Sequence, residues 1–179
     1  MHHPKLATRD LILCALFAAL TAICSQIAIP LQPVPLNLAT LSVYLAGGVL
    51  GGAYAALSQV VYVLLGMAGV PVFSSLRGGL AVLAGPTGGY IAGYILSALV
   101  IGLMAARWGK WWQLALALLA GTAVCYALGT AWYMLMSGAP LGSALGLCVL
   151  PFLPGDAVKI AVAVALIPQL KRGLAHIRR

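Results

Sequence analysis

The chain has 179 residues, of which 63% are hydrophobic and 7% are charged, and its formal net charge at pH 7 is +8. This composition excludes a water-soluble domain, because a fold of this size could not bury so much apolar side chain. The basic residues flank the apolar runs and gather at the end of the chain. That placement is typical of the cytoplasmic loops of a membrane protein and excludes a nucleic-acid-binding face.

The first apolar run covers about residues 11–29 and predicts a membrane-spanning helix. It is too long for the apolar core of a removable signal peptide and has no obvious cleavage site, so we expect it to remain in the protein. Small residues recur in it at a spacing of four, which lets a second helix approach closely. These residues are Ala15, Ala18, Ala19 and Ala22. They either pack inside the bundle or form a surface for a partner, and the second role is our candidate for this helix.

A proline-rich stretch, 29–35, follows and must form an extended turn. The next run, from 37 to 66, is about 30 residues long and would overshoot a membrane as one helix. Pairs of glycines interrupt it, so we expect two short spans, 37–50 and 53–66, that meet near Gly51.

Glycine and proline crowd the segment 66–89. Irregular backbone of this kind persists near a membrane only where protein or a wet cavity satisfies its polar groups. We expect the segment to hold a short helix that dips between the spans.

Three further apolar runs predict spans at 90–106, 112–136 and 154–170. If the basic residues before the first span, at Arg107 and Lys110, and after the last span are all cytoplasmic, an even number of crossings separates each group. Four spans before Arg107 and two after it satisfy this condition. The predicted fold is an all-α membrane protein, a single integral domain over 1–179 with six transmembrane helices and cytoplasmic N- and C-termini. The proline-rich turn, segment 66–89 and the loop near Pro140 then lie on the outer side.

Three ionisable residues lie away from the basic loops: Arg77, Asp156 and Lys159. Charged groups at membrane depth are costly and are candidates for function. On a helix, Asp156 and Lys159 would project from nearly the same face. Because Pro154 and Gly155 resemble a helix start, Asp156 should lie in the first turn, where the helix dipole favours an anion.

Two simpler interpretations compete with a binding site. Asp156 and Lys159 could only neutralise each other near the interface, and Arg77 could extend to lipid phosphates. We favour a pocket, because all three fall on the predicted outer side and together carry one positive charge, which suits a monoanion. A ligand carboxylate could pair with Arg77 or Lys159, while Asp156 accepts a ligand N–H. Polar residues expected around this otherwise apolar pocket are Gln32, Asn37, Tyr44, Gln59 and Tyr90.

Other classes of function find less support in the residues. An enzyme could use the three charges for acid–base chemistry on a lipid or a small amphiphile, but no nucleophile–base pair is present. A purely structural membrane subunit is a third interpretation. The glycine-rich segment 85–90 lacks the Lys-Ser/Thr ending of a phosphate loop, and cysteines and histidines do not cluster. We therefore expect no bound nucleotide, cofactor or metal in this chain.

Six motifs in order, within about residues 7–170, resemble the BioY family. They are Ala-Leu-Phe-Ala-Ala-Leu-Thr-Ala (15–22), Pro-Leu-Gln-Pro-Val-Pro-Leu (30–36), Gly-Val-Pro-Val-Phe (69–73), Arg-Gly-Gly-Leu (77–80), Gly-Pro-Thr-Gly-Gly-Tyr (85–90) and Pro-Gly-Asp-Ala-Val-Lys (154–159). The resemblance implies a biotin-specific substrate-binding (S) component of an energy-coupling factor (ECF) transporter, active in biotin uptake at a prokaryotic cell membrane and not an enzyme. It implies a transmembrane T component and two ATPases as partners, which would use the ATP, although some members are found without them.

The resemblance also implies roles for individual residues. The A-x-x-x-A pattern that docks on the T component matches Ala15 with Ala19, or Ala18 with Ala22 one turn on. Asp156 and Lys159 match the pair that lines the biotin site, Arg77 matches a family arginine, and 32–35 would act as a cover. We expect Asp156 to accept a ureido N–H and Lys159 to contact the ureido carbonyl or the carboxylate, with Arg77 as the alternative carboxylate partner.

Overall fold

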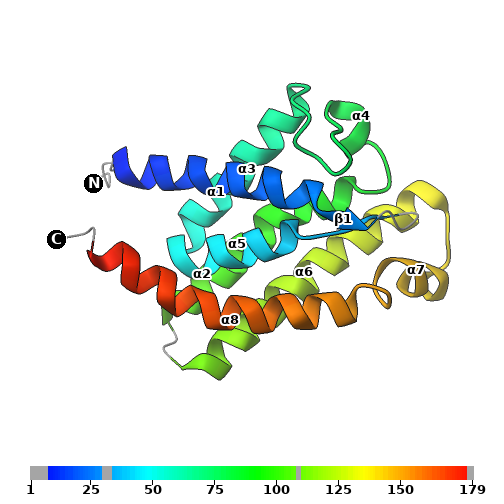
Figure 1. Cartoon of the computed structure of the whole chain (residues 1–179). Coiled ribbons are helices and arrows are strands. Elements are labelled where there is room, and N and C mark those ends of the chain that lie inside the picture. The colour runs from blue at the N-terminus through cyan, green and yellow to red at the C-terminus, as the bar shows by residue number, and fades with distance from the viewer. Residues whose placement is uncertain (1–7, 30–33, 108–109, 177–179) are drawn as a thin grey trace, which may run out of the picture.

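The computed structural model describes residues 8–29, 34–107 and 110–176. Most of these residues are helical, and two very short strands interrupt the helices (Figure 1). In chain order the elements are α1 (Thr8–Gln26), β1 (Ala28–Ile29), β2 (Leu36–Asn37), α2 (Ala39–Leu50), α3 (Gly52–Met67), α4 (Leu80–Leu83), α5 (Gly88–Arg107), α6 (Trp111–Ser137), α7 (Leu141–Cys148) and α8 (Leu153–His176).

Four helices among the described residues are long and apolar enough to cross a membrane: α1, α5, α6 and α8. Helices α2 and α3 are also apolar but have only 12 and 16 residues. At about 1.5 Å per residue, α2 is shorter than a hydrocarbon core of about 30 Å. The chain is therefore a mostly helical, multi-pass membrane protein.

Gly51 separates α2 from α3, at the place where the sequence predicts the turn. Its φ of 85° lies in the left-handed region that glycine adopts without strain. Helix α5 packs directly against this turn, because Gly102 has no side chain. A Cβ atom built on Gly102 would lie 2.3 Å from the Gly52 nitrogen and 2.5 Å from the Gly51 carbonyl carbon. We call this backbone-to-backbone approach the glycine contact.

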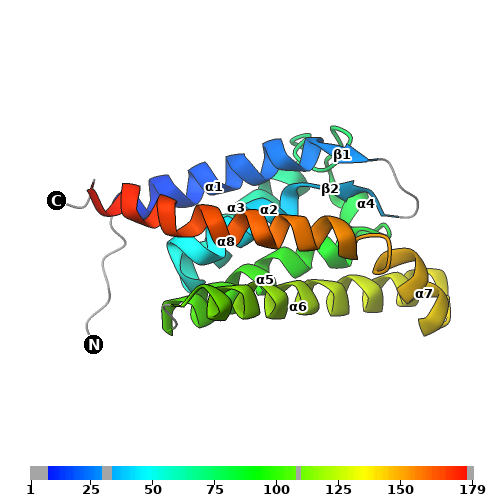
Figure 2. The ribbon, with the colours of Figure 1, turned by 60° about the horizontal axis from the view of Figure 1, so that its bottom comes forward.

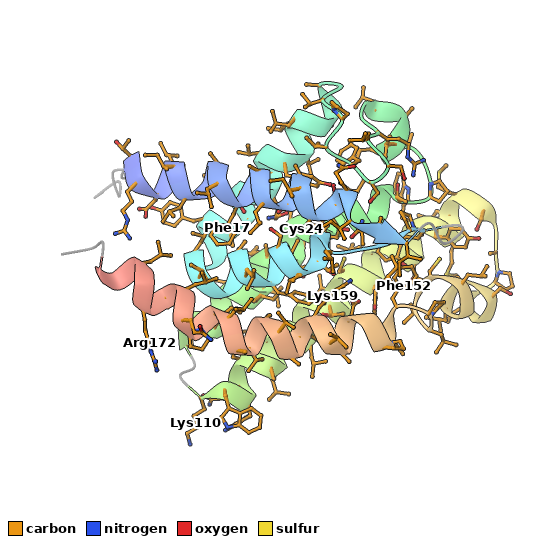
Figure 3. All side chains as sticks on the ribbon, in the orientation of Figure 1. Phe17, Cys24, Lys110, Phe152, Lys159 and Arg172 are labelled. Atoms are coloured by element: carbon orange, nitrogen blue, oxygen red, sulfur yellow. The ribbon has the colours of Figure 1, made fainter. Side chains whose placement is uncertain are left out.

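The bundle has two distinct ends. At one, the basic end, α1 begins and α8 ends side by side, and the Arg9 guanidinium donates a 2.9 Å hydrogen bond to the Leu174 carbonyl. Lys110 and Arg172 lie toward the same end (Figure 3). At the other, the loop end, lie the β1–β2 pair, α4 and α7, as Figures 1 and 2 show from two directions.

Two elements differ from the expectations drawn from the sequence. The proline-rich turn is flanked by β1 and β2, which pair antiparallel with Ala28 opposite Asn37, so the fold is not purely helical. Helix α7 lies where only a loop near Pro140 was expected. The Tyr90 hydroxyl donates a 2.9 Å hydrogen bond to the Cys148 carbonyl at the end of α7, which ties this helix to α5. Within 66–89, α4 is the expected short helix, but none of its residues is buried, so its insertion between the spans is not seen.

Candidate substrate-binding site

A cavity lies in the half of the bundle nearest the loop end. Helices α2, α3, α5, α6 and α8 contribute to its wall, together with the turn formed by residues 72–77. Much of the wall is aromatic: Tyr62, Phe73, Tyr90, Tyr94, Tyr126 and Phe152. Such a surface suits an apolar ligand body, while a few polar groups fix its orientation.

Asp156 and Lys159 lie together in this cavity, on the first turns of α8. The Lys159 ammonium is 2.8 Å from Asp156 Oδ1. Only 4% of the surface of Asp156 and 6% of the surface of Lys159 are exposed. The first-turn position of Asp156 agrees with the prediction from Pro154 and Gly155. Because two isolated charges would be very costly here, each stabilises the other. Figure 3 shows Lys159 pointing from α8 into the bundle.

Two hydroxyl groups complete this charged cluster. Lys159 Nζ donates a 2.9 Å hydrogen bond to Thr40 Oγ1, and Thr40 lies 3.4 Å from Asp156 Oδ1. Tyr126 donates its hydroxyl to Asp156 Oδ2. Neither residue could be selected from the sequence, because each is a single hydroxyl on an apolar helix, 116 and 30 positions from Asp156.

Among the described residues, the hydrogen bonds of this cluster leave some donor and acceptor positions free for a ligand. A carboxylate has about four acceptor positions, and Asp156 uses three of them, two on Oδ1 and one on Oδ2. An ammonium has three donors, and Lys159 uses two, toward Asp156 and Thr40. By this count, within the described part of the chain, Asp156 Oδ2 keeps one acceptor position and Lys159 keeps one donor, which together could serve a ligand that carries both an N–H group and a carbonyl.

Arg77 supplies a second charge at a different depth. It lines the cavity but is exposed to solvent, and its Nε donates a 3.3 Å hydrogen bond to the Ser74 carbonyl. The cavity thus has a buried charge pair and, at its mouth, an accessible guanidinium that can bind a carboxylate in two-point fashion.

Three other predicted residues line the cavity with their polar atoms already engaged. Asn37 donates to Ser74 Oγ at 2.6 Å, and the Tyr44 and Thr122 hydroxyls are 2.6 Å apart. The Tyr90 hydroxyl is held by the Cys148 carbonyl. These residues build the wall, and a ligand would meet the tyrosine rings more than their hydroxyls.

Gln59 does not lie at the rim of the cavity, and that expectation is wrong. It is fully buried outside the cavity lining, where its amide nitrogen donates to Thr21 Oγ1 at 3.2 Å and to Ser58 Oγ at 3.1 Å. Its side chain faces α1, and the apolar sequence around it shows no periodicity that could indicate this direction. Gln32 lies outside the described residues.

Comparison with known proteins identifies the group to which the chain belongs. The family model described as the BioY family matches residues 1–176. The chain belongs to the BioY family. This confirms the resemblance found in the six sequence motifs.

Curated relatives agree with this membership over nearly their whole length. The chain is 41% identical to "Biotin transporter BioY" of Thermotoga maritima, over 92% of this chain and 96% of that protein. It is 39% identical to "Probable biotin transporter BioY" of Pyrococcus horikoshii, over 91% and 96%. Both are named as transporters and neither as an enzyme.

Solved structures share the fold. A crystal structure of the S-component for biotin from an ECF-type ABC transporter superposes with a TM-score of 0.86 at 27% identity, covering 96% of this chain and 95% of that one. A structure of FolT bound with folic acid superposes with a TM-score of 0.63 at 19% identity, over 92% of each chain, and shows a shared fold alone.

The alanines of α1 in this BioY-family chain differ in exposure. Ala15 and Ala19 are exposed, whereas Ala18 is 1% exposed and belongs to the core, and Ala22 is half-buried. Of the two registers allowed by the sequence, only Ala15 with Ala19 presents both residues on the outer face of the helix.

Proposed function

We propose that this BioY-family chain binds biotin and acts in its uptake as the S component of an ECF-type transporter. The observation that carries the proposal is the buried Asp156–Lys159 pair in a largely apolar cavity, which keeps one acceptor and one donor free of contacts with the described residues. Biotin has a ureido group, with N–H donors beside a carbonyl, an apolar thiophane ring and a valerate carboxylate. The names of the curated relatives and of the superposed S-component support the same ligand.

The ligand's orientation follows from the two depths of charge. In this proposal a ureido N–H donates to Asp156 and the ureido carbonyl accepts from Lys159, while the thiophane ring lies against the aromatic wall. The carboxylate binds Arg77, because Lys159 is buried against Asp156 and Thr40, and Arg77 is accessible at the mouth. Asn37, Tyr44 and Tyr90 serve as wall residues.

The proposed topology has six crossings, with the short helices α2 and α3 crossing as a pair joined at Gly51. The basic end then faces the cytoplasm, with both termini, and the loop end with the cavity faces outward. We place the chain in the cell membrane of a prokaryote, surrounded by lipid, and the prokaryotic transporters to which it is similar support this placement. The partners are a T component and two ATPases, which use the ATP, and this chain itself needs no cofactor.

Equilibrium binding of labelled biotin to the purified protein in lipid nanodiscs tests the function. We expect saturable binding of one biotin per chain. Biotinamide, in which a neutral amide replaces the carboxylate, should bind at least about tenfold more weakly, because it loses a charge-assisted contact with Arg77.

Two results would contradict this proposal. Absence of saturable binding would exclude biotin as the ligand. Recovery of chemically altered biotin, detected by mass spectrometry of the released ligand, would indicate an enzyme instead of a transport component.

Replacing both Ala15 and Ala19 with leucine tests the docking face of α1. Two larger side chains on this exposed face should prevent close helix approach, so we expect loss of copurification with a T component and loss of uptake in cells. Biotin binding to the isolated chain should be unchanged, because neither alanine lines the cavity.

Helix α8 offers a matched control for this double variant. Ala161 and Ala165 have the same spacing and are also exposed. Their replacement with leucine should leave uptake intact. Equal losses from the two double variants would show that α1 has no special docking role.

A further inference from the structure

The last turn of α1 holds a segment that belongs to the cavity wall. Gln26 is the final residue of α1, and its Nε2 lies within hydrogen-bond distance of the carbonyls of Val72 and Phe73, each at 3.1 Å. Two acceptors of its own helix, the Ala22 carbonyl at 3.2 Å and Ser25 Oγ at 3.1 Å, share the two N–H groups of this amide. Its Oε1 accepts the Leu76 backbone N–H at 2.9 Å. The preceding residue, Ser25, donates to the same Val72 carbonyl at 2.5 Å. One side-chain amide therefore contacts both arms of the 72–77 turn, the arm with Val72 and Phe73 and the arm with Leu76.

This turn carries three side chains that line the cavity: Phe73, Ser74 and Arg77. Its two arms are joined by backbone hydrogen bonds between Phe73 and Arg77, at 2.9 and 3.2 Å. The Phe73 ring is 2% exposed and packs edge-on against Tyr62, with ring centroids 5.5 Å apart. The position of the turn thus sets both the aromatic wall and the guanidinium at the mouth.

The tip of the turn needs support from outside. Ser75 and Leu76 have φ values of 64° and 54°, in the left-handed region that residues with side chains rarely adopt. Such conformations persist where surrounding contacts hold them. At Leu76 the N–H is bound by Gln26, and the Leu76 side chain is 70% exposed, so packing of that side chain does not supply the support.

We propose that Gln26 is a positioning residue for the ligand site, although it does not line the cavity itself. It acts through the 72–77 turn, which it holds so that Phe73 closes the wall and Arg77 faces the ligand carboxylate. The inference rests on the proposed function, since it assigns Gln26 to the same biotin site. The role requires an amide, because the turn presents two carbonyls and one N–H to this side chain.

Two substitutions separate the donor and acceptor functions of the amide. Gln26→Met keeps the length of the side chain and removes both functions. Gln26→Glu keeps the acceptor for Leu76 and loses the donor toward Val72 and Phe73. Gln169→Met is the matched control, because Gln169 is an exposed helical glutamine whose amide, within the described ranges, bonds only the Ala165 carbonyl of its own helix.

The kinetic test is stopped-flow binding of biotin to each variant in nanodiscs, alone and combined with Arg77→Ala. We expect Gln26→Met to raise the dissociation rate roughly tenfold, the scale of one to two net hydrogen bonds. Gln26→Glu should be intermediate and Gln169→Met unchanged. In the Gln26→Met background, Arg77→Ala should have little further effect, because Arg77 is no longer held in place. Two results would overturn the positioning role. One is a dissociation rate that Gln26→Met leaves unchanged. The other is a double variant in which the effects of Gln26→Met and Arg77→Ala on the dissociation rate multiply in full.

A second measurement does not depend on biotin. Hydrogen exchange followed by mass spectrometry on the ligand-free protein should show faster exchange of backbone amides 73–77 in Gln26→Met than in the parent or in Gln169→Met. Unchanged exchange would overturn the inference even if biotin binds. Faster exchange in a protein that binds no biotin would support the hold on the turn and reject the proposed function instead.

Discussion

Asp156→Asn is expected to abolish tight biotin binding and to destabilise the bundle. The change removes the negative charge beside Lys159, a residue that is 6% exposed and has Asp156 as its ion-pair partner. Leaving a buried charge without its partner costs roughly 3–5 kcal/mol. The asparagine amide also adds a donor where the ureido N–H would bind. The affinity for labelled biotin should fall by at least about a hundredfold, since each loss of about 1.4 kcal/mol in binding free energy lowers the affinity tenfold. The melting temperature in detergent should fall as well.

A double variant separates loss of fold from loss of binding. Asp156→Leu combined with Lys159→Met removes both charges, and replacing a buried pair by apolar residues of similar volume is often neutral for stability. We expect the melting temperature to return toward that of the parent, while biotin binding stays lost. A double variant that binds biotin as tightly as the parent would remove the pair from the site.

Gly102→Ala is expected to disrupt the packing of α5 against the turn between α2 and α3. The added Cβ would lie within 2.5 Å of three backbone atoms of Gly51 and Gly52, and backbone cannot rotate away as a side chain can. Overpacking of this kind costs about 1–3 kcal/mol or more, which exceeds the helix propensity of roughly 1 kcal/mol gained when alanine replaces glycine. Thermal unfolding in detergent should show a clear fall in melting temperature.

Gly173→Ala provides the control for this prediction. Gly173 also lies in a helix, α8, but a Cβ there would meet nothing within 4 Å. The helix propensity gained should then act alone, leaving stability unchanged or slightly higher. If Gly102→Ala were as stable as Gly173→Ala, the glycine contact would not be important for packing.

The apolar runs of the sequence predicted much of the fold. The lengths of the runs indicated the long helices, and the glycines near Gly51 marked the break between α2 and α3. Helix α7 was missed because Leu141–Cys148 is short and follows a proline, and a distant hydrogen bond from Tyr90 helps to hold it. The β1–β2 pair was missed because two-residue strands have no periodicity to detect.

The candidate site was predicted where charge made residues conspicuous. Asp156, Lys159 and Arg77 could be selected because ionisable groups are rare in this chain. Thr40 and Tyr126 could not, because their contacts with the pair join helices that are distant in sequence. Gln59 was misplaced because, in a helix apolar on all sides, the sequence does not tell which face meets the cavity and which meets α1.

Helix α1 carries both the exposed Ala15–Ala19 face and the Gln26 amide that holds the 72–77 turn. Gln26 lies seven positions after Ala19, which is about 10 Å along a rigid helix. If docking on the alanine face moves the last turn of α1, the free energies of partner binding and ligand binding are coupled. Thermodynamic linkage then requires reciprocity: a partner that weakens biotin binding by a given factor is itself bound more weakly, by the same factor, when biotin is present.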